Sequence, residues 1–413
     1  MLINSLVLLI FLLSFIYSIK YKFIQLNLYK QCKEGLKNKK SYIAFLLSLG
    51  SHIGAGNILG VTTALIIGGP GVLFWMIICT VLTTIFSLME NTIGIKYKVK
   101  IDNESRGGSP YYILNGLKSK KLSIVFSLFL VLSGTIFFLP IQVRGVSFSI
   151  KQISGINNSC IFVLFFLFSF FVIFKGTSKI TKFIEKIVPI MTLFFLVFCT
   201  LAIILKINYI VEVFVLIIKE AFNFKSFGTT MILVGFKRSL FSNEAGLGTA
   251  PSINCYSDTK KPITQGYIQV LTCFIDTIVM CVMLGFIILL YDIDLTAYSG
   301  ELLAIKVFEY ILGPFGKIIG IFLLFTFSLA TIVSGYYAGE SNMLFNSIFL
   351  KNKVNILKFC YKLLFLLGII IGIFFDNNKL WSLVDVGLVI LGIINIYVII
   401  KLQKDFKSEI INK

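Results

Sequence analysis

Long apolar runs alternate with short polar, mostly basic segments along this chain of 413 residues. A helix needs about 20 apolar residues to cross the hydrocarbon core of a bilayer. Counting the runs that reach or approach this length, we predict an all-α integral membrane protein with eleven transmembrane helices. Their expected bounds are Leu2–Ile19, Ser41–Ile67, Val72–Ile95, Leu122–Ser149, Cys160–Phe174, Phe183–Leu205, Tyr209–Leu240, Thr264–Tyr291, Phe315–Asn342, Ile356–Phe375 and Leu380–Ile400.

One of these runs contains a break. Gly50-Ser51-His52-Ile53-Gly54-Ala55-Gly56-Asn57 lies near the middle of Ser41–Ile67, and glycine costs about 1 kcal/mol relative to alanine inside a helix. Hydrocarbon cannot satisfy the N–H and C=O groups that a break frees, so such breaks occur where they line a cavity and meet a ligand or an ion. The break therefore predicts a solute site at the membrane midplane.

A second, weaker interruption, Phe227-Gly228-Thr229, lies within Tyr209–Leu240. With the first run set aside, ten runs form two sets of five, and each set opens with an interrupted run. Because five is odd, the two sets cross the membrane in opposite senses, which is typical of transporters built from inverted repeats. The alternative is that these glycines serve close helix packing. The expected units are residues 1–40 (extra helix and basic linker), 41–206 (first repeat), 207–402 (second repeat) and 403–413 (tail).

Composition supports a membrane protein and explains the charge. The chain is 57% hydrophobic and only 14% charged, whereas soluble domains have about 25% charged residues. The net charge of +19 does not indicate a nucleic-acid partner, because the basic residues lie between the apolar runs. With the N-terminus outside, thirty of the 38 Lys and Arg residues fall on the inner side, as the positive-inside rule requires. We therefore predict an outer N-terminus and a cytoplasmic C-terminus.

The break and a later run supply polar groups for a small solute. Free N–H groups at Gly54, Ala55, Gly56 and Asn57 suit a carboxylate, and free C=O groups suit Na⁺. Hydroxyls at Ser328, Thr331 and Ser334 would complete a hard-oxygen Na⁺ site, or else bond to their own helical turn. His52 either titrates as a proton-coupling group or is a neutral hydrogen-bonding residue, and we favour the second role.

Ionisable residues within apolar runs cost about 2.5–3.5 kcal/mol each on insertion scales, so they are candidates for function. We interpret them as gating or structural residues, and we expect Gln142 to face the pocket. They are Glu90, Arg144, Asp276, Glu340 and Asp385.

No catalytic machinery is visible. The eight cysteines include no CxxC pair and the chain has one histidine, so a Cys/His zinc site is not expected. No nucleophile elbow or P-loop is present. We predict that the protein is not an enzyme and has no cofactor, with Na⁺ as its coupling ion.

Several long motifs resemble the sodium:alanine (alanine or glycine:cation) symporter family, and the likeness extends from Ser41 to about Ile400. The most specific are Gly54-Ala55-Gly56-Asn57-Ile58, Ile67-Gly68-Gly69-Pro70-Gly71, Arg106-Gly107-Gly108 and Gly235-Phe236-Lys237-Arg238-Ser239-Leu240-Phe241-Ser242-Asn243-Glu244-Ala245-Gly246-Leu247-Gly248-Thr249-Ala250-Pro251. The resemblance implies a LeuT-type inverted-repeat fold in a bacterial or archaeal plasma membrane, and Na⁺-coupled uptake of small neutral amino acids.

By matching position, the resemblance implies a substrate site and a sodium site. The substrate would contact Gly54, Ala55, Gly56, Asn57, Gln142, Thr331 and the wall at Gly335, and Na⁺ would contact Gly50, Ile53, Thr331 and Ser334.

The chain departs from the family pattern at three positions. Family members usually have Thr at position 55, Ser at position 330 and Trp at position 335, where this chain has Ala55, Ala330 and Gly335. Loss of the indole would enlarge the pocket, so we hypothesise a substrate side chain larger than that of alanine, up to the size of glutamine.

Three alternatives remain open. The first is proton coupling through His52 or a buried carboxylate. The second is an integral-membrane enzyme, for which residues 106–112 with Ser242-Asn243-Glu244 would be the catalytic cluster. The third is a channel.

Overall fold

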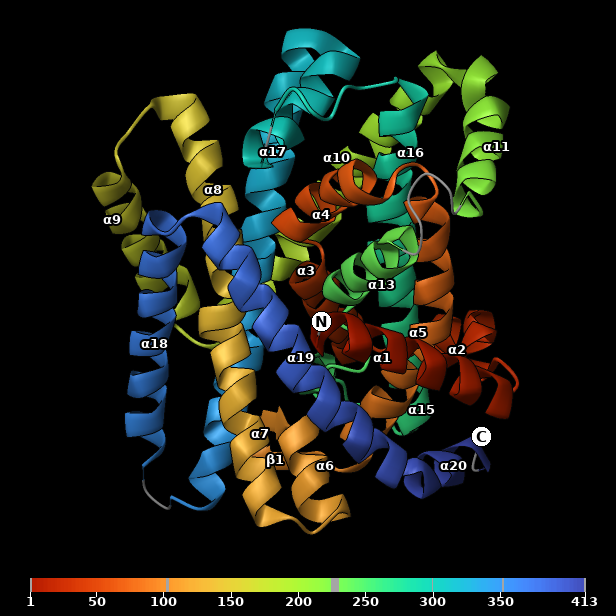
Figure 1. Cartoon of the computed structure of the whole chain (residues 1–413). Helices are drawn as coiled ribbons and strands as arrows, with labels where there is room; N and C mark the ends of the chain where they lie inside the picture. The colour runs from red at the N-terminus through yellow and green to blue at the C-terminus, as the bar shows by residue number, and fades with distance from the viewer. Residues whose placement is uncertain (1, 102–103, 224–229, 299, 351–352, 412–413) are drawn as a thin grey trace.

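Helices account for almost all of the computed structural model (Figure 1). The structure describes residues 2–101, 104–223, 230–298, 300–350 and 353–411. Within these ranges the strands are β1 (Val99–Ile101) and β2 (Glu104–Arg106), which pair antiparallel. The predicted helical class is therefore correct apart from this short hairpin.

Seven helices in the described part of the chain are long and apolar enough to cross a membrane. A bent pair, α3 (Lys39–His52) with α4 (Ala55–Gly68), adds an eighth span if the two halves are taken together. Eight of the predicted runs coincide with these spans. The seven are α5 (Val72–Lys96), α7 (Lys120–Leu132) with η2 (Ser133–Phe137) and α8 (Leu139–Ser154), α10 (Thr177–Leu205), α15 (Pro262–Phe274) with η5 (Ile275–Val282) and α16 (Met283–Leu290), α17 (Gly300–Phe345) with η6 (Asn346–Ile348), α18 (Val354–Phe374) and α19 (Asn377–Lys401).

The other three predicted runs do not form spans of that kind. Helix α1 (Leu2–Lys20) runs obliquely across the molecule while α5 and α15 stand upright (Figure 1). The run 160–174 forms α9 (Asn158–Phe168) and η3 (Ser169–Ile173), which together are shorter than a span. Within the described residues both are shorter apolar helices, Asn4–Lys20 and Asn158–Ile173.

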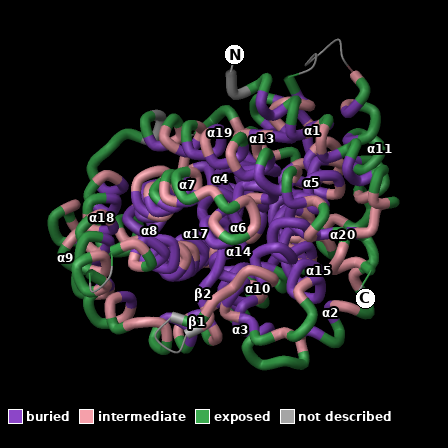
Figure 2. The backbone as a smooth tube through the Cα atoms, turned by 90° about the horizontal axis from the view of Figure 1, so that it is seen from below, coloured by how far each residue is buried: buried purple, intermediate pink, exposed green. Residues whose placement is uncertain are grey.

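The run 209–240 is two separate helices rather than one span. Helix α11 (Ile210–Ala221) lies at the periphery, and α13 (Thr230–Asn243) lies inside the bundle (Figures 1 and 2). The predicted interruption, Phe227-Gly228-Thr229, lies outside the described residues. The prediction of eleven spans is therefore not confirmed.

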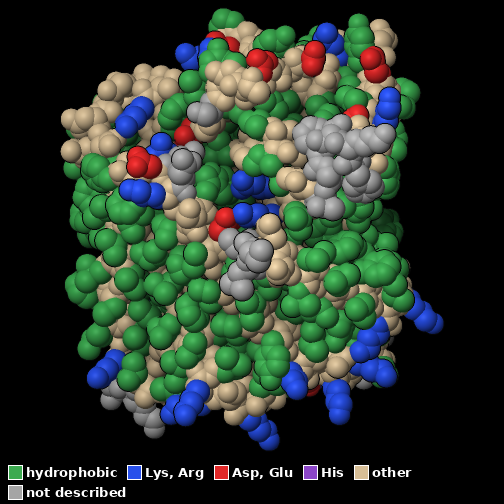
Figure 3. Space-filling model, viewed as in Figure 1, with side chains coloured by type: hydrophobic (Ala, Val, Ile, Leu, Met, Phe, Trp, Pro, Cys, Tyr) green, Lys and Arg blue, Asp and Glu red, His purple; other side chains and the backbone are tan. Residues whose placement is uncertain are grey.

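Buried residues concentrate in the middle of the bundle, in α4, α5, α14 (Ala250–Asn254), α15 and α17, whereas α9, α11 and α18 at the rim present exposed residues (Figure 2). Many exposed side chains of the rim are large and apolar, among them Phe170, Phe171 and Leu193. Figure 3 shows a broad belt of hydrophobic side chains, with Lys and Arg gathered along its lower edge. A belt of this kind is what contact with hydrocarbon requires.

Glycines allow the outer helices to approach the centre closely. A Cβ added at Gly368 of α18 would lie 1.9 Å from the Thr135 backbone oxygen, and one at Gly372 would lie 2.5 Å from the Pro140 backbone oxygen. Helix α18 therefore packs directly on the backbone of η2 and α8. The π-helical geometry of η2 interrupts the span that the sequence predicts as one regular helix.

Short helices complete the fold. The basic linker forms η1 (Ile24–Leu26) and α2 (Leu28–Gly35), and α2 packs against α15, where Cys32 Sγ lies 3.4 Å from the Tyr267 carbonyl oxygen. The tail forms α20 (Gln403–Ile411), whose Asp405 lies 3.1 Å from the Lys96 ammonium. The remaining elements are α6 (Ser109–Gly116) and η4 (Ile207–Tyr209).

Candidate functional site: a cavity between two helix breaks

The break predicted within the run Ser41–Ile67 is present. Helix α3 ends at His52, α4 begins at Ala55, and the two halves are bent by 45°. The first amides of α4 are satisfied by side chains: Gly54 N–H donates to Asn57 Oδ1 at 2.9 Å, and Ala55 N–H donates to Gln142 Oε1 at 2.8 Å. The N-terminus of α4 therefore already attracts acceptor oxygens, as helix N-termini do.

Carbonyl oxygens gather at the other side of the same break. Thr331 Oγ1, from α17, lies 3.0 Å from both the Gly50 and the Ile53 backbone oxygens, and 3.1 Å from that of Phe327. A hydroxyl has one proton to donate, so most of these lone pairs stay available. The predicted sodium residues Gly50, Ile53 and Thr331 therefore lie together.

Ser334, the fourth predicted sodium residue, lies beside them. Its hydroxyl is fully buried and has no hydrogen-bond partner among the described residues. A Cβ on Gly50 would lie 3.0 Å from Ser334 Oγ, so glycine permits this close approach. Buried polar atoms are nearly always paired, and an unpaired hydroxyl next to free carbonyls indicates an oxygen site for a cation.

A second break lies between α13 and α14, and the sequence analysis did not predict it. The connection 244–249 holds three residues at positive φ: Glu244 at 48°, Gly246 at 83° and Gly248 at 79°. Two glycines adopt this backbone at little cost, whereas the glutamate is strained. Lys237 and Arg238 are part of α13.

Glu90 holds the second break together. Its carboxylate accepts the Gly246 N–H at 3.3 Å, the Gly248 N–H at 3.0 Å and Asn395 Nδ2 at 2.7 Å. Of the two roles predicted for Glu90, this geometry favours the structural one.

Glu90→Ala is therefore expected to destabilise the protein by about 2–6 kcal/mol, because it leaves two buried amides without an acceptor at about 1–3 kcal/mol each. The apparent melting temperature of the purified protein in detergent measures this. Glu90→Gln keeps one acceptor oxygen, so its melting temperature should lie between those of the wild type and Glu90→Ala. Equal stability of all three proteins would contradict the assignment.

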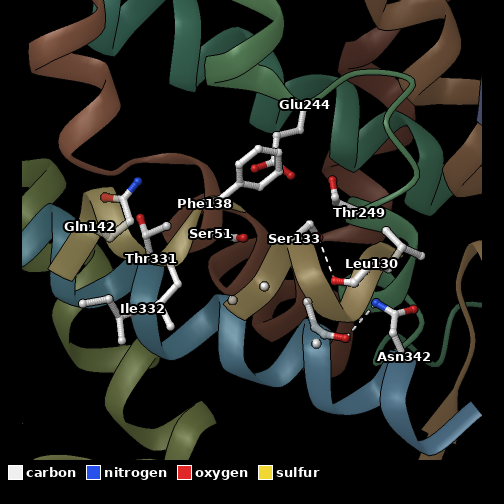
Figure 4. Close-up of a pocket in the computed structure, with 15 residues that line it drawn as sticks. Ser51, Leu130, Ser133, Phe138, Gln142, Glu244, Thr249, Thr331, Ile332 and Asn342 are labelled. Atoms are coloured by element: carbon white, nitrogen blue, oxygen red, sulfur yellow. Dashed lines mark hydrogen bonds between the residues drawn. The ribbon is translucent and has the colours of Figure 1, made fainter. Parts of the chain in front are cut away.

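A cavity lies between the two breaks. In Figure 4, Gln142 and Thr331 stand side by side at one end and Asn342 lies at the opposite end, while Glu244 and Phe138 also line the cavity. The lining residues are Ser51, Leu130, Ser133, Gly134, Phe138, Leu139, Gln142, Glu244, Thr249, Thr331, Ile332, Gly335, Ala338, Gly339 and Asn342.

The predicted substrate residues divide into three groups. Gln142, Thr331 and Gly335 line the cavity. Gly54 and Ala55 border it through Gln142, since Gln142 Oε1 accepts the Ala55 N–H and a Cβ on Gly54 would lie 2.6 Å from the same oxygen.

Gly56 and Asn57 lie away from the cavity. Gly56 packs on Phe241, whose ring atom would lie 2.4 Å from an added Cβ. The Asn57 side chain turns to Gly54 and Asp276. Successive residues of α4 face different directions around the helix axis. Which of them face the cavity depends on the rotation of α4 about that axis, and the sequence alone does not give this rotation.

Sequence reasoning missed Glu244 as a cavity residue and named it only as part of a possible catalytic cluster. The signal was available: Gly246 and Gly248 follow it at the spacing that Gly54 and Gly56 have in the first break. Proposed catalytic partners do not gather around it, since Ser242 Oγ donates to Asp276 and the Arg106 guanidinium lies over the Tyr337 ring.

Two of the predicted ionisable residues form ion pairs, and one of the two pairs lines a second hollow. Arg144 Nε lies 3.0 Å from Glu301 Oε1, and Lys237 Nζ lies 2.6 Å from Asp385 Oδ2. Arg144, Glu301 and Arg238 line a hollow of about 1410 Å³, and Figure 3 shows charged side chains around a recess in the upper half of the molecule. The pairs join α8 to α17 and α13 to α19.

His52 and Glu340 make local hydrogen bonds. His52 Nδ1 lies 2.6 Å from the Ser48 carbonyl oxygen, and its other ring nitrogen lies 3.4 Å from Gln269 Nε2. Glu340 accepts the Tyr336 hydroxyl at 3.2 Å, one turn earlier on α17. Neither lines the cavity, which agrees with the hydrogen-bonding role favoured for His52.

Comparison with known proteins identifies the family. The profile described as the sodium:alanine symporter family matches residues 1–412. The chain belongs to this family. It is therefore a sodium-coupled amino-acid symporter of the multi-pass membrane type.

Relatives agree with this membership. The chain is 29% identical over 415 residues to the amino-acid carrier protein AlsT of Bacillus subtilis, covering 96% of this chain and 88% of that protein. It is 30% identical to the probable sodium/glutamine symporter GlnT of B. subtilis, over 97% of this chain and 86% of the relative. It is 32% identical to the sodium/alanine symporter AgcS of Methanococcus maripaludis, over 72% and 68%.

A solved structure has a similar fold. The manganese transporter of Eremococcus coleocola matches 88% of this chain and 94% of its own, with a TM-score of 0.51 and 13% sequence identity. At this identity the likeness concerns the fold alone, which is that of a helical membrane transporter.

Proposed function

We propose that the protein carries small neutral amino acids into the cell with Na⁺ through the cavity between the two breaks. One observation carries the proposal: the break in α3–α4 presents amides on one side and carbonyl oxygens with the Thr331 hydroxyl on the other. These are the groups that a carboxylate and a sodium ion require. The Na⁺ ligands would be Gly50 O, Ile53 O and the hydroxyls of Thr331 and Ser334.

The substrate carboxylate would displace Gln142 Oε1 from the α4 N-terminus and accept the Ala55 N–H in its place. The substrate ammonium would then pair with Glu244, the one ionisable side chain among the described residues that line the cavity. The positive φ of Glu244 holds this carboxylate against the cavity at a conformational cost, which is common at functional sites.

Space for the substrate side chain lies beside Gly335. A Cβ added there would meet nothing within 4 Å, and the wall beyond includes the polar side chains of Ser133 and Asn342. We infer that the cavity accepts side chains larger than that of alanine, up to the size of glutamine. The relative named as a glutamine symporter agrees with this size.

The architecture we propose is a LeuT-type inverted repeat, with residues 41–206 and 207–402 as the halves, and residues 1–40 and 403–413 as additions at either end. Each half contains a broken helix at the cavity, α3–α4 in one and α13–α14 in the other. The basic lower edge in Figure 3 would face the cytoplasm, with the C-terminus inside and the N-terminus outside, in the plasma membrane of a bacterium or an archaeon.

The Arg144–Glu301 pair would act as an outer gate. It links α8 to α17, and Arg144 also donates to the Phe375 carbonyl oxygen at 2.8 Å. Na⁺ and substrate would favour one arrangement of the helices over another and so shift the equilibrium between outward- and inward-open states. One Na⁺ moving through 100 mV supplies about 2.3 kcal/mol, enough for roughly 50-fold accumulation.

Uptake of radiolabelled alanine and glutamine into proteoliposomes tests the proposal. We expect accumulation driven by an inward Na⁺ gradient and little uptake when choline replaces Na⁺. Uptake driven equally well by a proton gradient without Na⁺ would refute Na⁺ coupling. Ionic currents that do not saturate with substrate would indicate a channel.

Glu244→Gln tests the ammonium site. We expect the KM for alanine to rise about tenfold, because a charge-assisted hydrogen bond contributes about 1.5–3 kcal/mol. Lactate has a hydroxyl in place of the ammonium, so its competition against labelled alanine measures recognition of the ammonium group directly. The wild-type protein should reject lactate, and Glu244→Gln should lose much of this discrimination. Glu340→Gln, which changes a carboxylate outside the cavity, is the control.

A further inference from the structure

Asp276 is a buried carboxyl group that forms no ion pair among the described residues. Asp276 is 0% exposed and lies at the start of η5, in the span Pro262–Leu290. None of the ion pairs between described residues includes it. His52, at the adjoining break, is engaged with Ser48 and Gln269. A lone carboxylate at this depth is costly and marks a functional site.

Oxygen-bearing groups from three helical elements surround this carboxylate. Asn57 Nδ2 of α4 donates to Asp276 Oδ1 at 2.6 Å, and the Ser242 hydroxyl of α13 donates to Oδ2 at 2.5 Å. The Thr277 hydroxyl lies 3.3 Å from Oδ2 and 3.4 Å from Ser242 Oγ. Every partner is neutral, so hydrogen bonds spread the negative charge without cancelling it.

We propose that Asp276, Ser242 and Thr277, with Asn57, form a cation site for Na⁺ that is separate from the one at Thr331. The two hydroxyls donate to the carboxylate and still offer lone pairs of their own. With two carboxylate oxygens they provide the hard-oxygen set that an alkali cation takes. The π-helical geometry of η5 supports this assignment, because such segments are frequent at functional sites.

Asn57 connects this site to the substrate break. Its Oδ1 accepts the Gly54 N–H while its Nδ2 donates to Asp276. A cation at Asp276 would weaken the pull of the carboxylate on the Asn57 amide, and so change the orientation of the groups that receive the substrate carboxylate. Two sodium ions would then be coupled to one amino acid. This inference rests on the proposed function for its role in transport, but not for the binding of Na⁺.

Thermal stability of the purified protein tests Na⁺ binding without transport. A ligand that binds only the folded state raises the melting temperature. In Thr331→Val, which impairs the other site, Na⁺ should still stabilise relative to choline at constant ionic strength. In the double variant Thr331→Val, Asp276→Asn, this stabilisation should be lost. If Na⁺ fails to stabilise Thr331→Val, or a lower pH does so in its place, the site binds no Na⁺ and the proposal is wrong.

A milder variant covers the case in which Asp276→Asn does not fold. Thr277→Val removes one hydroxyl and should raise the half-saturating Na⁺ concentration for stabilisation by about tenfold or more, a typical loss at a metal site. Thr272→Val, on the same helix, is the control, because the Thr272 hydroxyl bonds only to the Ile268 carbonyl oxygen of its own turn among the described contacts. Equal effects of the two variants would overturn the assignment.

Flux measurements then separate this inference from the proposed function. In proteoliposomes the ratio of ²²Na⁺ to alanine should be about 2 in the wild type and about 1 in Asp276→Asn. A ratio of about 1 in the wild type would remove the second ion but leave symport intact. Absence of any Na⁺-driven amino-acid uptake would instead reject the proposed function, and the stability test would still decide whether Na⁺ binds at Asp276.

Discussion

Thr331→Val is expected to lower kcat/KM for Na⁺-driven amino-acid uptake by roughly 100-fold, a loss of about 2.7 kcal/mol. Valine has nearly the shape of threonine but no hydroxyl, so the packing of α17 is kept. The substitution removes the atom that lies 3.0 Å from both the Gly50 and the Ile53 carbonyl oxygens. It also removes a polar group from the cavity wall next to Gln142.

The half-saturating Na⁺ concentration should account for most of the loss, and Thr331→Ser, which restores the hydroxyl, should recover most of it. Thr326→Val is the matched control. Thr326 lies on the same helix and is buried, but its hydroxyl bonds to the Phe322 carbonyl oxygen of the preceding turn at 2.8 Å. If Thr331→Val transported with an unchanged Na⁺ dependence, the sodium site would not be at this break.

Gly335→Leu is expected to reduce glutamine uptake by roughly 100-fold while alanine uptake changes only a few-fold. The backbone at Gly335 is helical and its Cβ position is empty to 4 Å, so larger side chains fit without strain. They occupy the space that we assign to the substrate side chain. Each methylene in such a pocket changes discrimination by about 10- to 200-fold.

The series Gly335→Ala, Gly335→Val and Gly335→Leu should narrow the accepted size stepwise, measured by competition of unlabelled amino acids against labelled alanine. Alanine uptake in each variant is the internal control for folding. A wild-type protein that already accepts only alanine and glycine would disprove the larger pocket.

Much of the fold follows from hydropathy, and the exceptions have physical causes. Runs such as Val72–Ile95 and Phe183–Leu205 are so long and apolar that a helix crossing the membrane is favoured over a helix buried in a soluble domain. The run 209–240, predicted as one interrupted span, contains two separate apolar helices, α11 and α13, whose lengths together reach that of one span. Hydropathy measures composition over a window, and it does not detect a change of direction within that window.

For the site, the sequence predicted the break between α3 and α4 and did not predict the one between α13 and α14. Gly54 and Gly56 lie within a long apolar run and attract notice, whereas Gly246 and Gly248 follow charged residues that look like a loop. Gln142 and Thr331 were predicted as polar groups within apolar runs, the resemblance gave them a role in the substrate site, and the structure brings them together at the break. The rotation that turns Asn57 toward Asp276 depends on tertiary packing, which local sequence does not specify.

The glycine contacts of α18 limit how the transporter can move. Gly368 and Gly372 bring α18 onto the backbone of Thr135 in η2 and of Pro140 in α8, and this close contact opposes sliding of α18 along η2 and α8. These three elements would travel as one rigid arm. Opening on either side of the membrane would then require shear along the opposite face of this arm, where α8 meets Glu301 and the Thr331 end of α17.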